Sequence, residues 1–259
     1  MDDAMLAARQ LVGHRELYRS LGEASAGARV IEHPGGVLAA VVPARPERSV
    51  FNSVVYEDPD ALLAVRDALD DGYVEAGVQA WTVWVRPEHD ALRRALEAAG
   101  HRFDAQPMLM AAVIDELDLA PRATLDLEPA PTWEALARLN DRAYGIDPAG
   151  SFAAAFAGYD DPRGRLYLAR VDGEAAAGVG TLNVDDTCEI VFAATAPDAR
   201  GRGLCSELMR MGLREAGEAG CDVTTLEATA MGEPVYARLG YRSLGRLGMY
   251  ELRRAAAVS

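Results

Sequence analysis

The sequence contains no lysine and only three cysteines. All 26 basic residues are arginines, which excludes mechanisms that need a lysine Schiff base or a lysine general base. Cys188, Cys205 and Cys221 all lie in the second half, without the CxxC spacing of a zinc or redox site. An odd and sparse set of cysteines is typical of reduced proteins. We therefore expect a cytoplasmic protein that holds no metal.

Long hydrophobic runs and an excess of positive charge are also missing. No apolar run approaches the roughly 18 residues that span a bilayer, and the N-terminal segment MDDAMLAARQ lacks the basic region of a secretory signal. The net charge of −14 disfavours nucleic acid, because binding it needs a basic surface. The sequence therefore predicts a soluble protein with neither a nucleic-acid nor a membrane partner.

The length of 259 residues is enough for two modest domains. An acidic, proline-containing stretch at 115–131 holds the expected boundary, which we place between residues 119 and 120. Before this stretch, hydrophobic periodicity predicts helices and strands in alternation. The expected helices are 3–22, 59–72 and 88–99, and the expected strands are 28–32, 37–42, 51–56, 80–85 and 108–114.

The second half predicts a similar series and ends like the first. Its expected helices are 132–144, one that starts near Leu204, and 233–239; its expected strands are 166–171, 175–183, 188–195, 223–229 and 247–252. The segments LEAAGHR at 96–102 and YARLGYR at 236–242 both join a helix to a strand. This internal repeat favours two copies of one αβ unit over two unrelated domains.

A glycine loop, Arg-Gly-Arg-Gly-Leu-Cys at residues 200–205, lies between a buried strand and an amphipathic helix. Glycines let successive N–H groups converge on one point, and the first turn of the helix adds unpaired N–H groups. Arg200 and Arg202 add charge suited to phosphate oxygens. The loop predicts a pyrophosphate site that is neither a Walker A loop nor a GxGxxG motif. The alternative is an ordinary strand-to-helix turn.

This order of elements resembles the GNAT (Gcn-five-related N-acetyltransferase) superfamily over residues 125–253. The family signature [Q/R]-x-x-G-x-[G/A] matches the loop, except that Cys205 stands where Gly or Ala is usual. The resemblance implies an α/β (α+β) fold with two tandem GNAT-like domains, each a mixed, mostly antiparallel sheet flanked by helices. It also implies transfer of an acetyl group from acetyl-CoA to a primary amine, without a metal.

The resemblance further implies which residues bind acetyl-CoA. In this family the strand before the loop splays away from the next strand, and the pantetheine arm enters the gap. Backbone groups of Ala193, Ala194 and Thr195 would pair with the arm, and one N–H would stabilise the oxyanion. Thr229 stands where many members have a cofactor-contacting Asn. The pyrophosphate would lie on the loop residues Arg200, Gly201, Arg202, Gly203, Leu204 and Cys205.

The segment PVYARLGY at 234–241 resembles the LYxxxGF segment of the family. The match implies that Tyr236 protonates the departing CoA thiolate. A phenol has a pKa of about 10 and a thiol one of about 8.5, so a neutral tyrosine can return a proton to a thiolate. The alternative is a core aromatic residue on a short helix.

A general base is harder to assign, because the second half contains no histidine. The four histidines are His14, His33, His89 and His101, and the first half can lend one of them as a base. Within the second half the base is a carboxylate, a backbone carbonyl or a water. Glu227 and Glu189 are the carboxylate candidates, since both lie on strands near the loop. The alternative for each is a salt-bridged or solvent-facing strand residue.

The first half lacks the functional motifs. Residues 60–65 hold no glycine, and Leu96 stands at the position of Tyr236. We therefore expect a degenerate GNAT-like domain at 1–119 and a catalytic domain at 120–259. The expected partner is a small-molecule amine acceptor, and the expected assembly is a monomer or homodimer. The alternative function is a non-catalytic acyl-CoA-binding regulatory or sensor protein.

Overall fold

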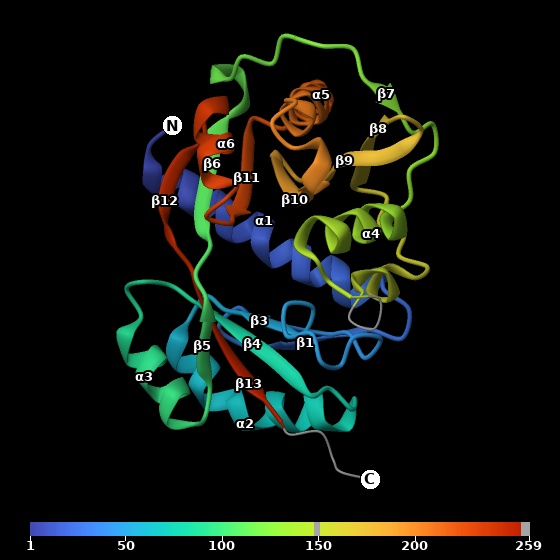
Figure 1. The fold of residues 1–259 in the computed structure, drawn as a ribbon. Helices are drawn as coiled ribbons and strands as arrows, with labels where there is room; N and C mark the ends of the chain where they lie inside the picture. Colours follow the sequence, from blue (N-terminus) through green and yellow to red (C-terminus); the bar gives the residue numbers. More distant parts are fainter. Residues whose placement is uncertain (148–150, 255–259) are drawn as a thin grey trace. The chain divides into compact units, whose positions relative to one another are not determined.

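A computed structural model describes residues 1–147 and 151–254, which form two sheets flanked by helices (Figure 1). Two compact units are present: Met1–His14 with Leu109–Leu244, and Arg15–Met108 with Gly245–Ser259.

The helices are α1 (Asp3–Ala24), α2 (Pro59–Glu75), α3 (Asp90–Ala98), α4 (Trp133–Tyr144), α5 (Leu204–Glu218) and α6 (Glu233–Leu239), with short 3₁₀ turns at Ile114–Glu116, Phe152–Phe156 and Pro197–Ala199. The strands are β1 (Arg29–His33), β2 (Val37–Val41), β3 (Ser53–Val55), β4 (Ala80–Val85), β5 (Arg102–Ala105), β6 (Met108–Val113), β7 (Asp126–Leu127), β8 (Gly164–Val171), β9 (Glu174–Val184), β10 (Thr187–Thr195), β11 (Val223–Ala228), β12 (Arg242–Arg246) and β13 (Gly248–Arg253).

The first unit is built on a seven-stranded sheet of order β12-β6-β11-β10-β9-β8-β7. Strands β7 to β10 pair antiparallel, whereas β10 and β11 pair parallel. The two faces carry different helices, because neighbouring side chains of a strand point in opposite directions. Leu168 packs with Leu139 of α4, while Tyr167 donates a hydrogen bond to Glu215 of α5 at 2.7 Å. The mixed, mostly antiparallel sheet expected from the sequence is confirmed.

The second unit repeats part of this plan in a six-stranded sheet of order β1-β2-β3-β4-β13-β5. Here β3 and β4 are the parallel pair, joined through α2, as β10 and β11 are joined through α5. Its core includes the fully buried Trp81, which stacks on Tyr73 of α2 with ring centroids 5.0 Å apart. All six residues of β4 are buried, so both faces of the strand are covered. This explains why its sequence, AWTVWV, is an almost continuously apolar run.

Each sheet takes one strand from the other half of the sequence. β6 lies between β12 and β11, and β13 lies between β4 and β5, where six residues of β13 are in register with β4. The compact units therefore do not end at the expected boundary between residues 119 and 120. The physical reason is that β6 and β13 follow short edge strands and complete a sheet by pairing with strands distant in sequence.

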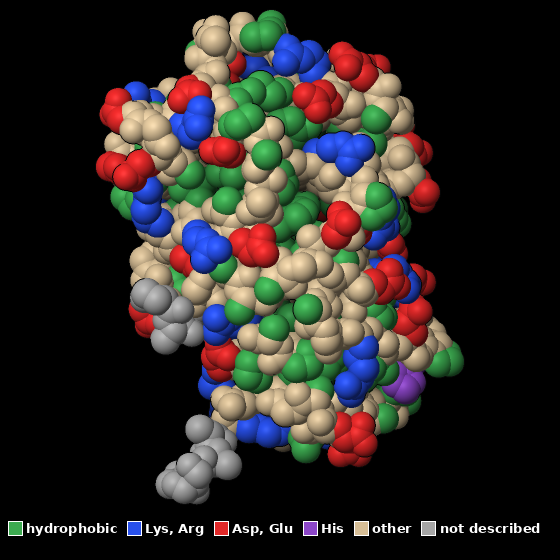
Figure 2. Space-filling view, turned by 90° about the vertical axis from the view of Figure 1, so that its right-hand side faces the viewer, with side chains coloured by type: hydrophobic (Ala, Val, Ile, Leu, Met, Phe, Trp, Pro, Cys, Tyr) green, Lys and Arg blue, Asp and Glu red, His purple; other side chains and the backbone are tan. Residues whose placement is uncertain are grey.

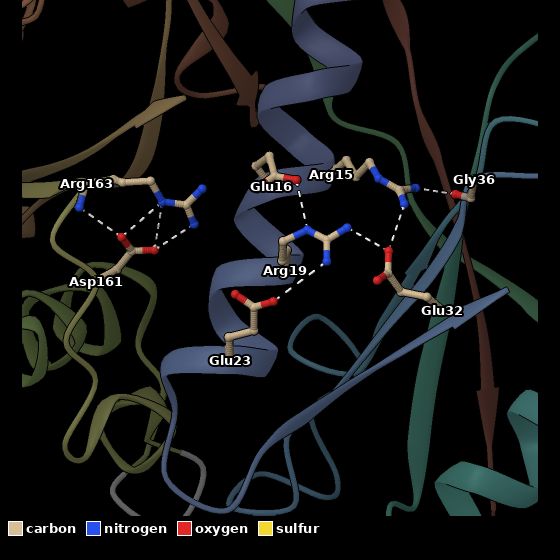
Figure 3. A network of polar contacts seen from close by, with 8 residues as sticks. All are labelled: Arg15, Glu16, Arg19, Glu23, Glu32, Gly36, Asp161 and Arg163. Atoms are coloured by element: carbon tan, nitrogen blue, oxygen red, sulfur yellow. Dashed lines mark hydrogen bonds and ion pairs between the residues drawn. The ribbon is translucent and has the colours of Figure 1, made fainter. Parts of the chain in front are cut away.

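Helix α1 belongs to both units, which meet in sequence between His14 and Arg15. In its first part, Leu6 is fully buried in a cluster with Ala111 and Val223. Its second part is held to β1 by an ion pair (Figure 3): Arg19 donates to Glu32 of β1 at 2.6 Å, and it also donates to Glu16 of α1 itself at 3.0 Å. The Arg19 hydrogen bond holds the pKa of Glu32 below its usual range.

The described residues hold neither a membrane-spanning helix nor a metal-binding cluster. None of their helices is long and apolar enough to cross a bilayer. In residues 1–147 and 151–254, no group of three His, Cys, Asp or Glu side chains is placed to hold a metal ion. The three cysteines are free thiols. On the face shown in Figure 2, acidic and arginine side chains are interspersed, so the negative charge is not gathered in one patch there.

Candidate functional site

A cavity of about 540 Å³ opens in the first unit, where β10 and β11 meet the start of α5. Residues from α4 and α6 complete its walls. Most of the site residues expected from the sequence line this cavity: Ala193, Ala194, Thr195, Arg200, Gly201, Gly203, Leu204, Cys205, Glu227, Thr229 and Tyr236. Two of them do not line it, namely Glu189 and Arg202.

The cavity exists because β10 and β11 diverge beyond their last paired residues. Their parallel pairing runs only from Thr187–Val223 to Glu189–Thr225, although β10 continues to Thr195 and β11 to Ala228. On its other side β10 shifts register against β9 between Val191 and Ala194, and the intervening Phe192 has a φ of 51°. A bulge of this kind bends a strand and leaves backbone groups unpaired. The divergent strands form the two walls of the cavity.

The glycine loop forms one end of the cavity. Gly201 and Gly203 have φ values of 75° and 76°, a conformation that side chains with a Cβ rarely adopt. A Cβ at either position would meet no protein atom within 4 Å, so the space beside the loop is open. Gly203 is also the N-cap of α5, and no side chain caps that helix. The N–H groups of its first turn are thus available to an anion.

The two loop arginines behave differently. The Arg200 guanidinium donates to the backbone carbonyl of Ala143 in the last turn of α4 at 2.6 Å. This bond ties the loop to a helix C-terminus, where a cation is favoured. Arg202 is exposed and lies outside the cavity lining. Arg200 is therefore part of the site wall, whereas Arg202 is in contact with solvent.

Tyr236 projects from α6 into the cavity lining and is 8% exposed. Burial raises the pKa of its phenol well above the ordinary value, and neighbouring Cys205 and Tyr144 add to the effect. The Tyr236 phenol is therefore neutral at physiological pH. Burial likewise raises the pKa of the Cys205 thiol to about 11. Since the nucleophile of cysteine chemistry is the thiolate, Cys205 is not suited to that role.

Glu227 and Glu189 form a coupled carboxyl pair beside the cavity. Glu227 lines the cavity and its side chain is 14% exposed. Glu189 is fully buried, and the Thr225 hydroxyl donates to its Oε2 atom. Burial, followed by the charge of Glu227, raises the pKa of Glu189 well above its usual range. The pair thus has one carboxyl that faces the cavity and one that is held away from it.

The elements that form the cavity lie in a segment that matches a known protein family. Residues 133–241 match the profile of the acetyltransferase (GNAT) family. This segment contains α4, the splayed strands, the glycine loop and Tyr236.

The chain contains a GNAT acetyltransferase domain.

Its enzyme class is therefore acyltransferase, and the general activity is N-acetyl transfer from an acyl-CoA, with acetyl-CoA as the donor that the family uses. No curated protein matches the chain significantly.

Solved structures share the fold over almost the whole chain. A GCN5-related N-acetyltransferase from Kribbella flavida is 17% identical with a TM-score of 0.64, and 95% of each chain is covered. A functionally unknown conserved protein from Staphylococcus epidermidis is 15% identical with a TM-score of 0.65, and covers 88% of this chain and 94% of its own. A tandem GNAT protein from the clavulanic acid biosynthesis pathway is 14% identical with a TM-score of 0.55, covering 85% and 79%. At such identities the likeness shows the fold alone.

Two residues near the GNAT domain's carboxyl pair were missed at the sequence level. Gln10 and His14 lie on α1, outside the segment that matches the family, and both contact Glu227. The available signal was their spacing, since residues i and i+4 share one face of a helix. Polar residues at that spacing are ordinarily assigned to the solvent-exposed face of a helix, yet Gln10 is fully buried and His14 is 2% exposed.

In the second unit, the position that corresponds to the glycine loop is the start of helix α2, and it is closed to an anion. Its helix α2, which joins the parallel strands β3 and β4, is capped by Asp58, whose carboxylate accepts from the N–H of Asp60 at 2.9 Å. The N–H groups of Glu57 and Asp58 donate to the carbonyl of Gly35 at 3.2 and 2.9 Å. A capped helix start with acidic side chains repels a pyrophosphate.

The gap after β3 and β4 is closed as well. Tyr56 follows β3 and its hydroxyl lies 2.7 Å from His89 Nδ1. Arg86 follows β4, donates to the Tyr56 carbonyl at 3.3 Å and lies 5.9 Å from the centre of the Tyr56 ring. These contacts bridge the two segments beyond the last paired residues, Val54 and Val83.

Proposed function

We propose that this protein transfers an acetyl group from acetyl-CoA to the primary amine of a small molecule, by direct attack of the amine on the thioester. The observation that carries the proposal is that Glu227 and Tyr236 line the same cavity as the splayed strand and the glycine loop. A proton acceptor and a proton donor therefore face one space that is open to both an acyl-CoA and an amine.

The donor fits the residues of this cavity. The open space beside Gly201 and Gly203 and the uncapped start of α5 suit a pyrophosphate. Backbone groups of Ala193, Ala194 and Thr195 lie along the β10 wall, where they can pair with a pantetheine arm and donate to a thioester oxygen. Thr229 lines the cavity opposite, at the end of β11.

The chemistry needs two proton transfers. The nitrogen lone pair of the amine attacks the thioester carbonyl carbon, the C–N bond forms and the C–S bond breaks. Glu227 takes the proton that the amine nitrogen loses, and Tyr236 gives its phenolic proton to the departing thiolate. Glu227 then returns a proton to the Tyr236 phenolate through water, so that both groups are restored. The raised pKa of Cys205 argues against an acetyl-cysteine intermediate, which supports direct transfer.

The second unit is assigned as a degenerate GNAT-like domain. Its support is the closed helix start at Asp58 and the closed gap between Tyr56 and Arg86. One acetyl-CoA per chain follows from this assignment. We assign a small molecule as the acceptor because the site is a cavity of about 540 Å³ within the first unit, a volume typical of small-molecule sites.

Acetyl-CoA turnover against a panel of amines tests this function. The panel includes aminosugars, polyamines, amino acids and amino-thiol conjugates, and the readouts are free thiol and the mass of the acetylated product. We expect thiol release that depends on one class of amine and matches acetylated product one to one. Binding of acetyl-CoA without turnover on any amine would contradict an enzyme and favour an acyl-CoA sensor.

A further inference from the structure

The first part of helix α1 reaches the carboxyl pair of the GNAT domain. Gln10, Gly13 and His14 lie on one face of the helix, at spacings of three and four residues. Gln10 Nε2 lies 2.5 Å from Glu227 Oε1, and His14 Nδ1 lies 2.8 Å from the same oxygen. The His14 side chain is 3% exposed. A buried histidine thus contacts the carboxylate that we assign as the base.

Glu189 lies on the other side of Gly13. A Cβ atom on Gly13 would be 2.5 Å from Glu189 Oε2, so the glycine lets α1 approach the strand. Within the described part of the chain, Glu189 Oε1 has no hydrogen-bond donor. Its coupled neighbour is a second carboxyl group, that of Glu227. Two adjacent carboxyls cannot both ionise in a buried site, and they share a proton.

The remaining groups around the pair decide which carboxyl is charged. On the sheet, Cys188 and Tyr241 interact with Glu189, and burial raises the pKa of both, so both are neutral. On α1, Gln10 and His14 approach Glu227. Hydrogen bonds to a carboxylate favour its charged form. Burial raises the pKa of Glu189, although the Thr225 hydroxyl donates to it, and we therefore assign the shared proton to Glu189.

We propose that His14 is the positioning residue of the catalytic base: its Nδ1, 2.8 Å from Glu227 Oε1, pairs with that oxygen and fixes the carboxylate toward the cavity. The inference rests on the proposed function, in which Glu227 takes the proton of the amine. Gln10 and His14 both approach the same carboxylate oxygen, Glu227 Oε1, from α1. A segment outside the family match thereby completes the active site.

The first test compares two substitutions of His14. An Asn side chain places an N–H donor near the position of Nδ1, whereas Phe fills the space without a donor. We expect His14→Phe to lower kcat on the order of 10²-fold, as expected for a misplaced catalytic group, and to leave acetyl-CoA affinity unchanged. The acid limb of its kcat/KM profile moves to higher pH, because the carboxylate has lost a donor. His14→Asn retains most of kcat and the wild-type limb.

A matched control is His101→Asn, which removes another fully buried histidine. His101 Nδ1 lies 3.0 Å from the carbonyl of Tyr250, and neither residue lines the cavity. We expect wild-type kcat and pH profile from this variant. Wild-type kcat in His14→Phe would overturn the inference. Equal loss in His14→Asn and His14→Phe would also overturn it, because ring packing rather than the donor would then matter.

A second test does not depend on turnover. Ring ¹⁵N spectra of histidine-labelled protein are recorded without substrates, and His14→Asn identifies the His14 signals. We expect Glu227→Gln to shift the His14 Nδ1 signal and to leave the His101 signals in place. An unmoved His14 signal overturns the pairing of His14 with Glu227 itself. A wild-type chain that binds acetyl-CoA and acetylates no amine overturns the proposed function instead, so the two failures are distinguishable.

Discussion

Gly13 of α1 and Glu189 of β10 are packed so closely that a methyl group does not fit between them. An ideal Cβ on Gly13 would lie 2.5 Å from Glu189 Oε2 and 2.9 Å from Thr225 Oγ1. Both oxygens belong to a buried hydrogen-bonded pair. The glycine is therefore retained for the close approach of a helix to a buried carboxyl, even though glycine disfavours a helix interior.

This contact predicts that Gly13→Ala destabilises the protein. In an unobstructed helix the same change stabilises by about 1 kcal/mol, so loss of stability identifies a steric cost. Gly217→Ala is the control, since a Cβ in that part of α5 would lie 3.3 Å from a single flexible Ile114 methyl group. Urea unfolding of both variants measures the effect. A Gly13→Ala variant as stable as Gly217→Ala would contradict the packing described.

The proton on Glu189 makes stability depend on pH. The native pKa is raised above that of the unfolded chain, so the native state keeps a proton that the unfolded chain releases. Stability is highest below the unfolded pKa and falls as pH rises toward the native pKa, by about 1.4 kcal/mol per pH unit. Glu189→Gln removes this term. We expect its Tm, relative to wild type, to rise as pH is raised above the ordinary glutamate pKa.

Glu218→Gln is the control for that measurement, because Glu218 is exposed on α5. Its Tm difference from wild type should stay flat over the same range. If the Glu189→Gln difference is also flat, Glu189 is not the protonated member of the pair.

Tyr236→Phe should retain acetyl-CoA binding and lose turnover. The ring still fills its place in the cavity wall, but the proton donor is gone, and loss of a positioned acid costs about 10²–10⁴-fold in rate. Tyr241→Phe is the control: its hydroxyl is buried 2.8 Å from Thr224 Oγ1 and does not line the cavity. Steady-state thiol release measures both. Wild-type turnover in Tyr236→Phe would require a different donor, such as water.

The elements of the fold were more predictable than their assembly. The strand at 80–85 and the helix at 233–239 were predicted with their observed bounds, because apolar patterning and flanking Gly and Pro are local signals. Strands β5 and β12 were missed, since both are short and neither contains a fully buried residue. The apolar segments β6 and β13 read as buried strands, but nothing local specifies which sheet each one joins.

The site residues likewise divide into those that a local motif specifies and those that only the folded chain brings together. Gly201, Gly203 and Tyr236 were found because they lie in a short motif with a physical requirement at each position. His14 was only one of four histidines available to the first half. Its contact with Glu227 depends on where α1 docks, and that is fixed by burial of Leu6 and the approach of Gly13, not by the helix pattern.

The exchanged strands predict that residues 120–259 do not fold alone. This fragment lacks β6, which lies between β12 and β11, and keeps β13 without the strands it pairs with. Circular dichroism and heteronuclear NMR of the fragment test this, with the full chain as reference. A cooperatively folded fragment that binds acetyl-CoA would show that the exchange is dispensable.

We expect the chain to have one acyl-donor site, at the glycine loop of the GNAT domain. Calorimetric titration with acetyl-CoA tests it most directly, on wild type, Gly203→Val and Gly77→Val. Gly77 has a φ of 72° and open surroundings like Gly203, but lies after α2 and away from the cavity, so it controls for backbone strain. We expect one acetyl-CoA per chain in wild type and Gly77→Val, and no binding in Gly203→Val. Two molecules per chain, or unchanged affinity in Gly203→Val, would contradict the claim.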